Sequence, residues 1–139
     1  MWSGAMILEL TLPFPPSVNT YWRHVDKGNF VQTLISANGR KFKKMASEIA
    51  RRQFMGMSIA AFSHPVSVKI RFYPPDKRVR DLDNYLKALL DAITEAGIWV
   101  DDRLVHELNL AWGGVKQGGS TSVSIREIEG RPNGQMSLL

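Results

Sequence analysis

Hydrophobic and polar residues alternate along several short segments of the chain, which is the pattern of half-buried β-strands. The alternation predicts strands over residues 7–12, 66–73, 105–115 and 120–128, with a shorter candidate over residues 30–35. Pro13 follows the first of these strands and Pro65 opens the second. Because proline lacks a backbone donor, it is common where a strand begins or ends.

Two longer segments have the apolar spacing of amphipathic helices. The first runs from about Asn38 to Ala60 behind Ser36, which can cap it. Its lysines and arginines fall mostly outside its apolar stripe. The second covers roughly residues 83–96 and stops at Gly97, a common C-terminal residue of helices.

Residues 16–24 separate the first strand from the first helix, and their composition predicts a polar and aromatic loop. The order of elements then indicates an α+β fold, a single domain in which a mixed β-sheet packs with two main helices. We assign this domain to residues 1–129. Residues 130–139 are polar and contain proline and glycine, so we expect a flexible tail.

Composition narrows the classes of protein. The chain has 139 residues, of which 44% are hydrophobic and none is cysteine. The length suits one domain with a buried core. Without cysteine, disulfides, thiol nucleophiles and cysteine-bound zinc are excluded, and a reducing cytoplasm is indicated. No segment approaches the roughly 20 apolar residues of a membrane span, so we expect a cytoplasmic protein with no membrane partner.

The net charge of +5 is unevenly distributed. Residues 1–80 hold 13 bases and 4 acids, a net charge of +9, whereas residues 81–139 hold 5 bases and 9 acids, a net charge of −4. A basic first half suits a polyanion such as DNA or RNA, although a merely basic surface is the alternative on charge alone. The acids are concentrated between Asp81 and Asp102.

Asp81 and Asp83 lie two residues apart, behind a basic run and just before the second helix. In mid-helix such neighbours point apart, but in an extended or turn segment they face the same way. Carboxylates crowd together only where a cation offsets their repulsion, and Mg²⁺ is the obvious candidate. The alternative is that Asp81 or Asp83 only caps the helix.

From Asp83, steps of four residues reach Lys87 and Asp91, so one polar stripe of the helix carries acid, base and acid. The turn after Gly97 can bring Asp101 or Asp102 beside this stripe. The alternative for Lys87 is that it only forms an ion pair on the helix surface. Asp91 either supports the site or merely pairs with Lys87. Which member of the Asp101-Asp102 pair points inward stays open.

Two segments resemble the motifs of a known family. The early segment is Pro15-Pro16-Ser17-Val18-Asn19-Thr20-Tyr21-Trp22-Arg23, similar to a Pro-Pro-Ser-x-Asn-x-Tyr-x-Arg motif. The central segment is Arg80-Asp81-Leu82-Asp83-Asn84, followed by Lys87, Asp91, Gly97 and Asp101-Asp102. Over roughly residues 7–128 the chain resembles the RusA-type crossover junction endodeoxyribonucleases.

The resemblance implies a homodimeric, Mg²⁺-dependent enzyme, with Mn²⁺ as a substitute, that resolves four-way Holliday junctions and is often carried by phages or prophages. It implies that Asp81, Asp83 and Asp102 are catalytic, metal-binding acids and that Lys87 is the basic catalytic residue. The DNA-binding residues by position are Arg80, Arg78, Lys77, Asn19 and Arg23. The chain departs from the family where residues 25–34 look longer than its compact loop and where Val79 interrupts the basic run.

The sequence therefore predicts an endodeoxyribonuclease that cuts branched DNA in recombination and repair by paired, symmetric hydrolysis of phosphodiester bonds. A non-catalytic module that binds branched DNA or RNA is the alternative from another class, and an RNA-directed nuclease is a third. A homodimer is expected because two symmetric cuts need two sites. Tyr21 and Trp22 either stack on DNA or pack against the sheet. His24, His64 and His106 are scattered along the chain, so we expect them to have surface or structural roles.

The C-terminal segment has a separate signal. Residues Gln135, Met136, Ser137, Leu138 and Leu139 resemble the peptide that binds the bacterial DNA polymerase sliding clamp. The three apolar side chains would fill a pocket and the glutamine would orient the peptide. A disordered end without a partner is the alternative.

Overall fold

The computed structural model describes residues 7–128, and its main element is a mixed sheet of four strands in the order β1-β6-β4-β5. The strands are β1 (Ile7–Leu12), β4 (Val66–Tyr73), β5 (Val105–Trp112) and β6 (Ser120–Glu127). β6 runs antiparallel to both β1 and β4, whereas β4 and β5 are parallel. The predicted α+β fold with a mixed sheet is confirmed.

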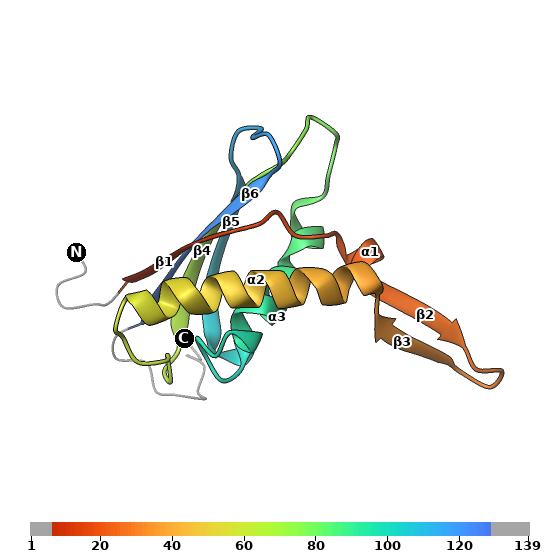
Figure 1. Ribbon diagram of the computed structural model, residues 1–139, viewed down its shortest axis with the longest axis horizontal. Helices are drawn as coiled ribbons and strands as arrows, with labels where there is room; N and C mark the ends of the chain where they lie inside the picture. Colours follow the sequence, from red (N-terminus) through yellow and green to blue (C-terminus); the bar gives the residue numbers. More distant parts are fainter. Residues whose placement is uncertain (1–6, 129–139) are drawn as a thin grey trace, which may run out of the picture.

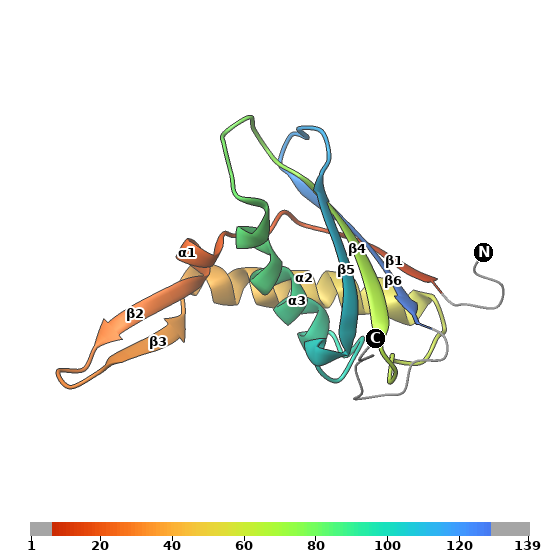
Figure 2. The same ribbon diagram turned by 180° about the vertical axis from the view of Figure 1, so that it is seen from behind.

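Alternation along the strands places one face of the sheet in the core. In β4, Val66, Val68, Ile70 and Phe72 are fully buried, while the residues between them are partly or wholly exposed. The buried face packs against α2 (Ala37–Gly56) and α3 (Leu86–Glu95), which contribute Ala50, Leu89 and Ile93 to the same core cluster. In Figure 1 the two helices lie on the same side of the sheet, and Figure 2 shows the sheet from behind.

The helices begin and end close to their predicted limits. Ser36 caps α2 as expected, because its Oγ accepts a hydrogen bond from the Gly39 N–H at 3.0 Å. α2 ends at Gly56, earlier than the predicted Ala60. The physical reason is local: Ser58 has a φ of 54°, which a right-handed helix does not accommodate.

The second helical segment begins differently from the prediction. A short 3₁₀ helix, η1 (Leu82–Tyr85), precedes α3, so Asp83 lies in a tighter turn than an α-helix would give it. Gly97 then ends the segment with a φ of 80°, a conformation that favours glycine.

The loop predicted over residues 16–24 is wrong in part. It contains a one-turn helix, α1 (Val18–Tyr21), and a strand, β2 (Trp22–Asp26), which pairs antiparallel with β3 (Val31–Ile35). These two strands form a ribbon that projects from the body of the molecule (Figure 1). Strand β3, the partner of β2, lies beyond a turn, so the polar composition of residues 16–24 alone did not indicate the pairing.

Strand β5 ends at Trp112 instead of continuing to residue 115. The backbone turns there at Gly113, where a Cβ would lie 2.2 Å from the ring of Tyr73. Although β5 and β6 follow one another in the chain, they are not neighbours, because β4 lies between them. The parallel pairing of β4 and β5 requires a crossover, and η1 and α3 supply it.

No helix within residues 7–128 is long and apolar enough to cross a membrane. The proposed boundary after residue 129 lies outside the described residues.

Candidate active site

The loop between β4 and η1 is held together by Asp76. Its carboxylate accepts a hydrogen bond from the Arg78 N–H at 3.0 Å and pairs with the Arg80 Nη2 at 2.8 Å. The Arg78 backbone N–H, with the Arg80 and Arg78 guanidinium groups, holds the pKa of Asp76 below its usual value. The Arg80 side chain is only 9% exposed and lies 5.6 Å above the centre of the Phe14 ring. Arg80 therefore stabilises the loop that precedes Asp81.

Asp81 and Asp83 follow this loop directly. Asp81 has an extended backbone, and its carbonyl accepts a hydrogen bond from the Asn84 N–H at 3.1 Å. Asp81 occupies the N-cap position of η1, but its side chain makes no capping hydrogen bond. Both side chains are exposed, and among residues 7–128 neither carboxylate has a recorded hydrogen bond or ion pair.

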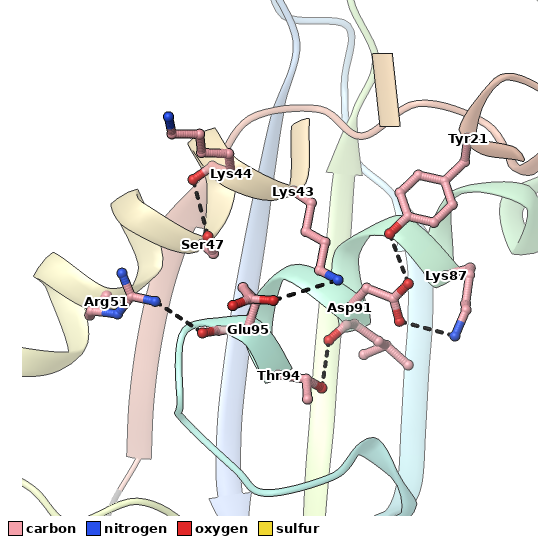
Figure 3. Close-up of polar contacts among 10 residues, drawn as sticks. Tyr21, Lys43, Lys44, Ser47, Arg51, Lys87, Asp91, Thr94 and Glu95 are labelled. Atoms are coloured by element: carbon pink, nitrogen blue, oxygen red, sulfur yellow. Dashed lines mark hydrogen bonds and ion pairs between the residues drawn. The ribbon is translucent and has the colours of Figure 1, made fainter. Parts of the chain in front are cut away.

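Lys87 is held by a chain of contacts that ends in the core. Its Nζ lies 3.0 Å from the Asp91 Oδ1, and the Tyr21 hydroxyl donates to the Asp91 Oδ2 at 2.8 Å (Figure 3). Burial raises the pKa of the Tyr21 hydroxyl, and the Asp91 carboxylate raises it further, so the hydroxyl keeps its proton and remains a donor. Asp91 thus bridges a buried tyrosine and a half-exposed lysine.

Tyr21 reaches this position because α1 packs tightly against α2. Its side chain is fully buried in a small cluster with residues of α2 and α3. A Cβ at Gly39 would lie 2.6 Å from the Tyr21 carbonyl oxygen, so the close approach of the two helices depends on that glycine. Tyr21 was expected either to stack on DNA or to pack against the sheet. The structure shows packing, but against α2 and α3 instead of the sheet, with a hydrogen bond to Asp91 that the sequence analysis missed.

The Asp101-Asp102 pair divides into two roles. Asp101 caps the 3₁₀ helix η2 (Asp102–Leu104), because its Oδ1 accepts from the Arg103 N–H at 2.8 Å. This backbone hydrogen bond is the largest cause that lowers the pKa of Asp101. Asp102 instead lies within electrostatic reach of Lys87 and Asp91.

Burial and nearby charges together set the pKa of Asp102. Burial is the largest cause that raises its pKa, and Asp101 and Asp91 raise it further. Lys87 acts in the opposite direction, but the net shift is upward. The structure therefore brings Asp102, Lys87 and Asp91 together from η2 and α3, and a cation near Asp102 would relieve the repulsion.

A metal ion is the cation that the family resemblance implies. Carboxylate oxygens are the donors that Mg²⁺ prefers, so the residue types fit. The raised pKa of Asp102 and the unpartnered carboxylates of Asp81 and Asp83 in the described part of the chain agree with that chemistry. Within residues 7–128, however, no group of three or more His, Asp or Glu side chains is close enough to hold a metal ion. The acids would have to converge to bind one.

The residues predicted to contact DNA lie in two places. Lys77 and Arg78 are exposed on the loop before Asp81, unlike the buried Arg80. Asn19 is exposed on α1, and Arg23 is exposed on the projecting ribbon. The structure thus places cations beside the acids and others on a separate arm.

Comparison with known proteins adds an independent finding. The family described as endodeoxyribonuclease RusA matches residues 13–126. The crossover junction endodeoxyribonuclease RusA of Escherichia coli strain K12 is 37% identical over 120 residues, which is 86% of this chain and 94% of that protein. The proteins of the same name from Shigella sonnei and from Enterobacteria phage 82 are each 38% identical with the same coverage.

Proposed function

The chain belongs to the RusA family of endodeoxyribonucleases, and from that premise we propose that it resolves four-way DNA junctions by paired, symmetric hydrolysis of two phosphodiester bonds. The observation that carries the proposal is the meeting of Asp102 with Lys87 and Asp91 within the matched region. A carboxylate and a lysine beside exposed acids are the groups that phosphodiester hydrolysis requires.

We propose that Asp81, Asp83 and Asp102 are the residues that would hold Mg²⁺, or Mn²⁺ in its place. When bound, the metal would polarise the scissile phosphate and lower the pKa of an attacking water. The exposed carboxylates of Asp81 and Asp83 and the crowded carboxylate of Asp102 support this assignment.

Lys87 is proposed to stabilise the negative charge that develops on the transition state. Its Nζ is held 3.0 Å from Asp91, and Tyr21 in turn holds Asp91 at 2.8 Å. Asp91 and Tyr21 are therefore positioning residues, since they orient Lys87 without reaching the substrate themselves. A side chain fixed before substrate binds needs less reorganisation during the reaction.

Cations near the acids are proposed to hold the DNA backbone. Lys77 and Arg78 are exposed on the loop that precedes Asp81, so they are available to phosphates. Arg78 also pairs with Asp76, at 3.4 Å, but its side chain is 77% exposed. Arg80 lies 2.8 Å from Asp76 with its side chain only 9% exposed, so it supports binding indirectly. Two cuts at symmetric positions require two copies of the site, and a two-fold dimer supplies them.

The test is incubation of the full-length protein with a synthetic four-way junction and Mg²⁺. We expect paired nicks at symmetric positions in opposing strands and little cutting of a linear duplex of the same sequence. The Asp83→Asn protein, with its fold verified by thermal unfolding, is the matched control. Binding of the junction without nicks, over several metals and junction sequences, would favour the non-catalytic alternative.

Sliding-clamp binding through residues 135–139 stays a proposal, because these residues lie outside the described part of the chain. A short peptide that orders on binding gives only modest affinity, but tethering would raise the local concentration of the enzyme at replicating DNA. Deleting residues 135–139 should leave junction cleavage unchanged and abolish retention by an immobilised bacterial clamp. Equal retention of the full and truncated proteins would mean that the segment has no such role.

A further inference from the structure

Helix α2 carries far more positive charge than its role in the core requires. It holds six lysine or arginine residues and one carboxylate, Glu48. Phe42, Ala46 and Ala50 form its buried side. At about 100° per residue, Arg40, Lys44 and Arg51 fall within about 40° of one another on the helix surface, so they form one stripe.

This stripe borders a groove between α2 and the end of α3. The residues that line the groove include Arg40, Lys43, Lys44, Ser47, Glu48, Arg51 and Glu95. Figure 3 shows the α2 side chains and Glu95 on facing elements. The Lys43 Nζ lies 3.5 Å from the Glu95 Oε1, and the Arg51 Nη2 donates to the Glu95 carbonyl oxygen at 3.0 Å. The groove walls are therefore joined by contacts that α2 cations make with one residue of α3.

The charge of the groove is positive after these contacts are counted. Its four cations exceed its two carboxylates, and the carboxylate of Glu95 is already paired with Lys43. Lys44 is exposed and, among residues 7–128, has no recorded ion pair or side-chain hydrogen bond. A polar groove with an unpaired lysine on its rim suits an anion instead of an apolar peptide.

The groove also adjoins the candidate active site. Asp91 and Glu95 are one helical turn apart on α3, and Asp91 belongs to the Tyr21–Asp91–Lys87 chain (Figure 3). The stripe from Arg40 to Arg51 spans about 16 Å along the helix. A DNA strand carries one phosphate about every 3.4 Å of duplex axis, so a stripe of this length is sufficient for several phosphates.

We propose that this groove binds the sugar–phosphate backbone of a duplex arm of the DNA substrate, beyond the phosphate that is cut. That the ligand is junction DNA rests on the proposed function. That the groove contacts this DNA rests on the charge and position of the groove. Lys44 makes the direct contact with phosphate, while Lys43 and Arg51 join α2 to α3 through their contacts with Glu95.

The test compares charge reversals on the two sides of α2, in the Asp83→Asn background so that DNA is bound and not cut. Lys44→Glu changes the groove, with Lys44→Gln as a milder second variant. Lys41→Glu and Arg52→Glu are matched controls, because both residues are exposed and lie about 100° and 120° around the helix from Arg40. Among residues 7–128, neither has a recorded ion pair. Fluorescence anisotropy would measure junction affinity at several NaCl concentrations, and thermal unfolding would verify that each variant is folded.

We expect Lys44→Glu to weaken junction binding about tenfold more than either control and Lys44→Gln to reduce the salt dependence by about one unit of slope. In the otherwise unchanged enzyme, Lys44→Glu should raise the DNA concentration needed for half-maximal cleavage. Equal weakening by all three reversals would overturn the proposal, because only net charge would then matter. A changed molecular mass of Lys44→Glu in light scattering would also overturn it, by assigning the groove to a protein interface. Absence of cleavage with the groove effect intact would count against the proposed function alone.

Discussion

The cationic and acidic parts of the candidate site are organised in different ways. Lys87 is bonded to Asp91, and Asp91 is bonded to Tyr21, whose side chain is fully buried. Asp81 and Asp83, in contrast, have no recorded side-chain partner among residues 7–128. The protein's own core fixes the lysine, whereas these two acids are exposed to solvent.

Asp102 connects the two parts. It lies near Lys87, which favours its charged form, but burial and the neighbouring Asp101 and Asp91 outweigh that effect and raise its pKa. The comparison indicates that the fold builds the basic part of the site in advance. In the acidic part, the charged form of Asp102 is disfavoured, and a nearby cation would favour it.

The largest effect is expected from the acidic part. Asp83→Asn should reduce junction cleavage by at least about 10³-fold while leaving junction affinity nearly unchanged, because a proposed metal ligand is lost but the phosphate contacts remain. Single-turnover cleavage and anisotropy would measure the two quantities, and calorimetric titration with Mn²⁺ should show weaker metal binding. Ordinary turnover by the variant would make Asp83 a surface residue and remove the distinction between the two parts.

Removing the lysine should have the next largest effect. Lys87→Ala is expected to slow single-turnover cleavage about 10²–10³-fold at saturating DNA, because the charge proposed to stabilise the transition state is lost. Its Mn²⁺ affinity should change much less than that of Asp83→Asn. A large loss of metal affinity in Lys87→Ala would show that the two parts are not separate.

A smaller effect is expected from the support behind Lys87. Tyr21→Phe removes only the hydroxyl that donates to Asp91, so the ring still fills its buried position. We expect kcat to fall about tenfold with KM nearly unchanged, and stability to fall by about 1 kcal/mol for the lost hydrogen bond. Tyr85→Phe, which alters another buried tyrosine, is the matched control. A loss of stability with unchanged kcat would make the role of Tyr21 structural only.

The smallest effects are expected in stability, with opposite signs at adjacent residues. The raised pKa of Asp102 means that its charge opposes folding, so Asp102→Asn should raise the unfolding temperature of the metal-free protein near neutral pH. The lowered pKa of Asp101 means that its charge favours folding, so Asp101→Asn should lower that temperature.

The changes in unfolding temperature caused by Asp102→Asn and Asp101→Asn should each depend on pH. The destabilisation by charged Asp102 is present above its raised folded-state pKa and disappears as pH falls below the unfolded value. The stabilisation by charged Asp101 is lost as pH falls through its lowered folded-state pKa. Thermal unfolding at a series of pH values measures both, and shifts of the same sign would contradict the division of roles between the two residues.

The sequence by itself determined the local elements and the candidate residues of the site. Alternating residues identified the strands of the sheet, and Ser36 and Gly97 marked a helix start and a helix end that the structure confirms. The family motifs singled out the acids and Lys87 as candidates, since their spacing along the chain can be recognised without any fold. Local periodicity and capping involve residues a few positions apart, and for that reason they are legible in sequence.

Only the tertiary structure decided which distant residues meet. The hydrogen bond from Tyr21 to Asp91 joins residues 70 positions apart, and no pattern in either segment indicates the other. The same holds for Arg80, which the packing of its loop places on Asp76 and Phe14, and for the choice of Asp102 over Asp101 as the residue near Lys87. These outcomes depend on how helices and strands pack together, and the free energy of packing is shared among many side chains that are far apart in the chain.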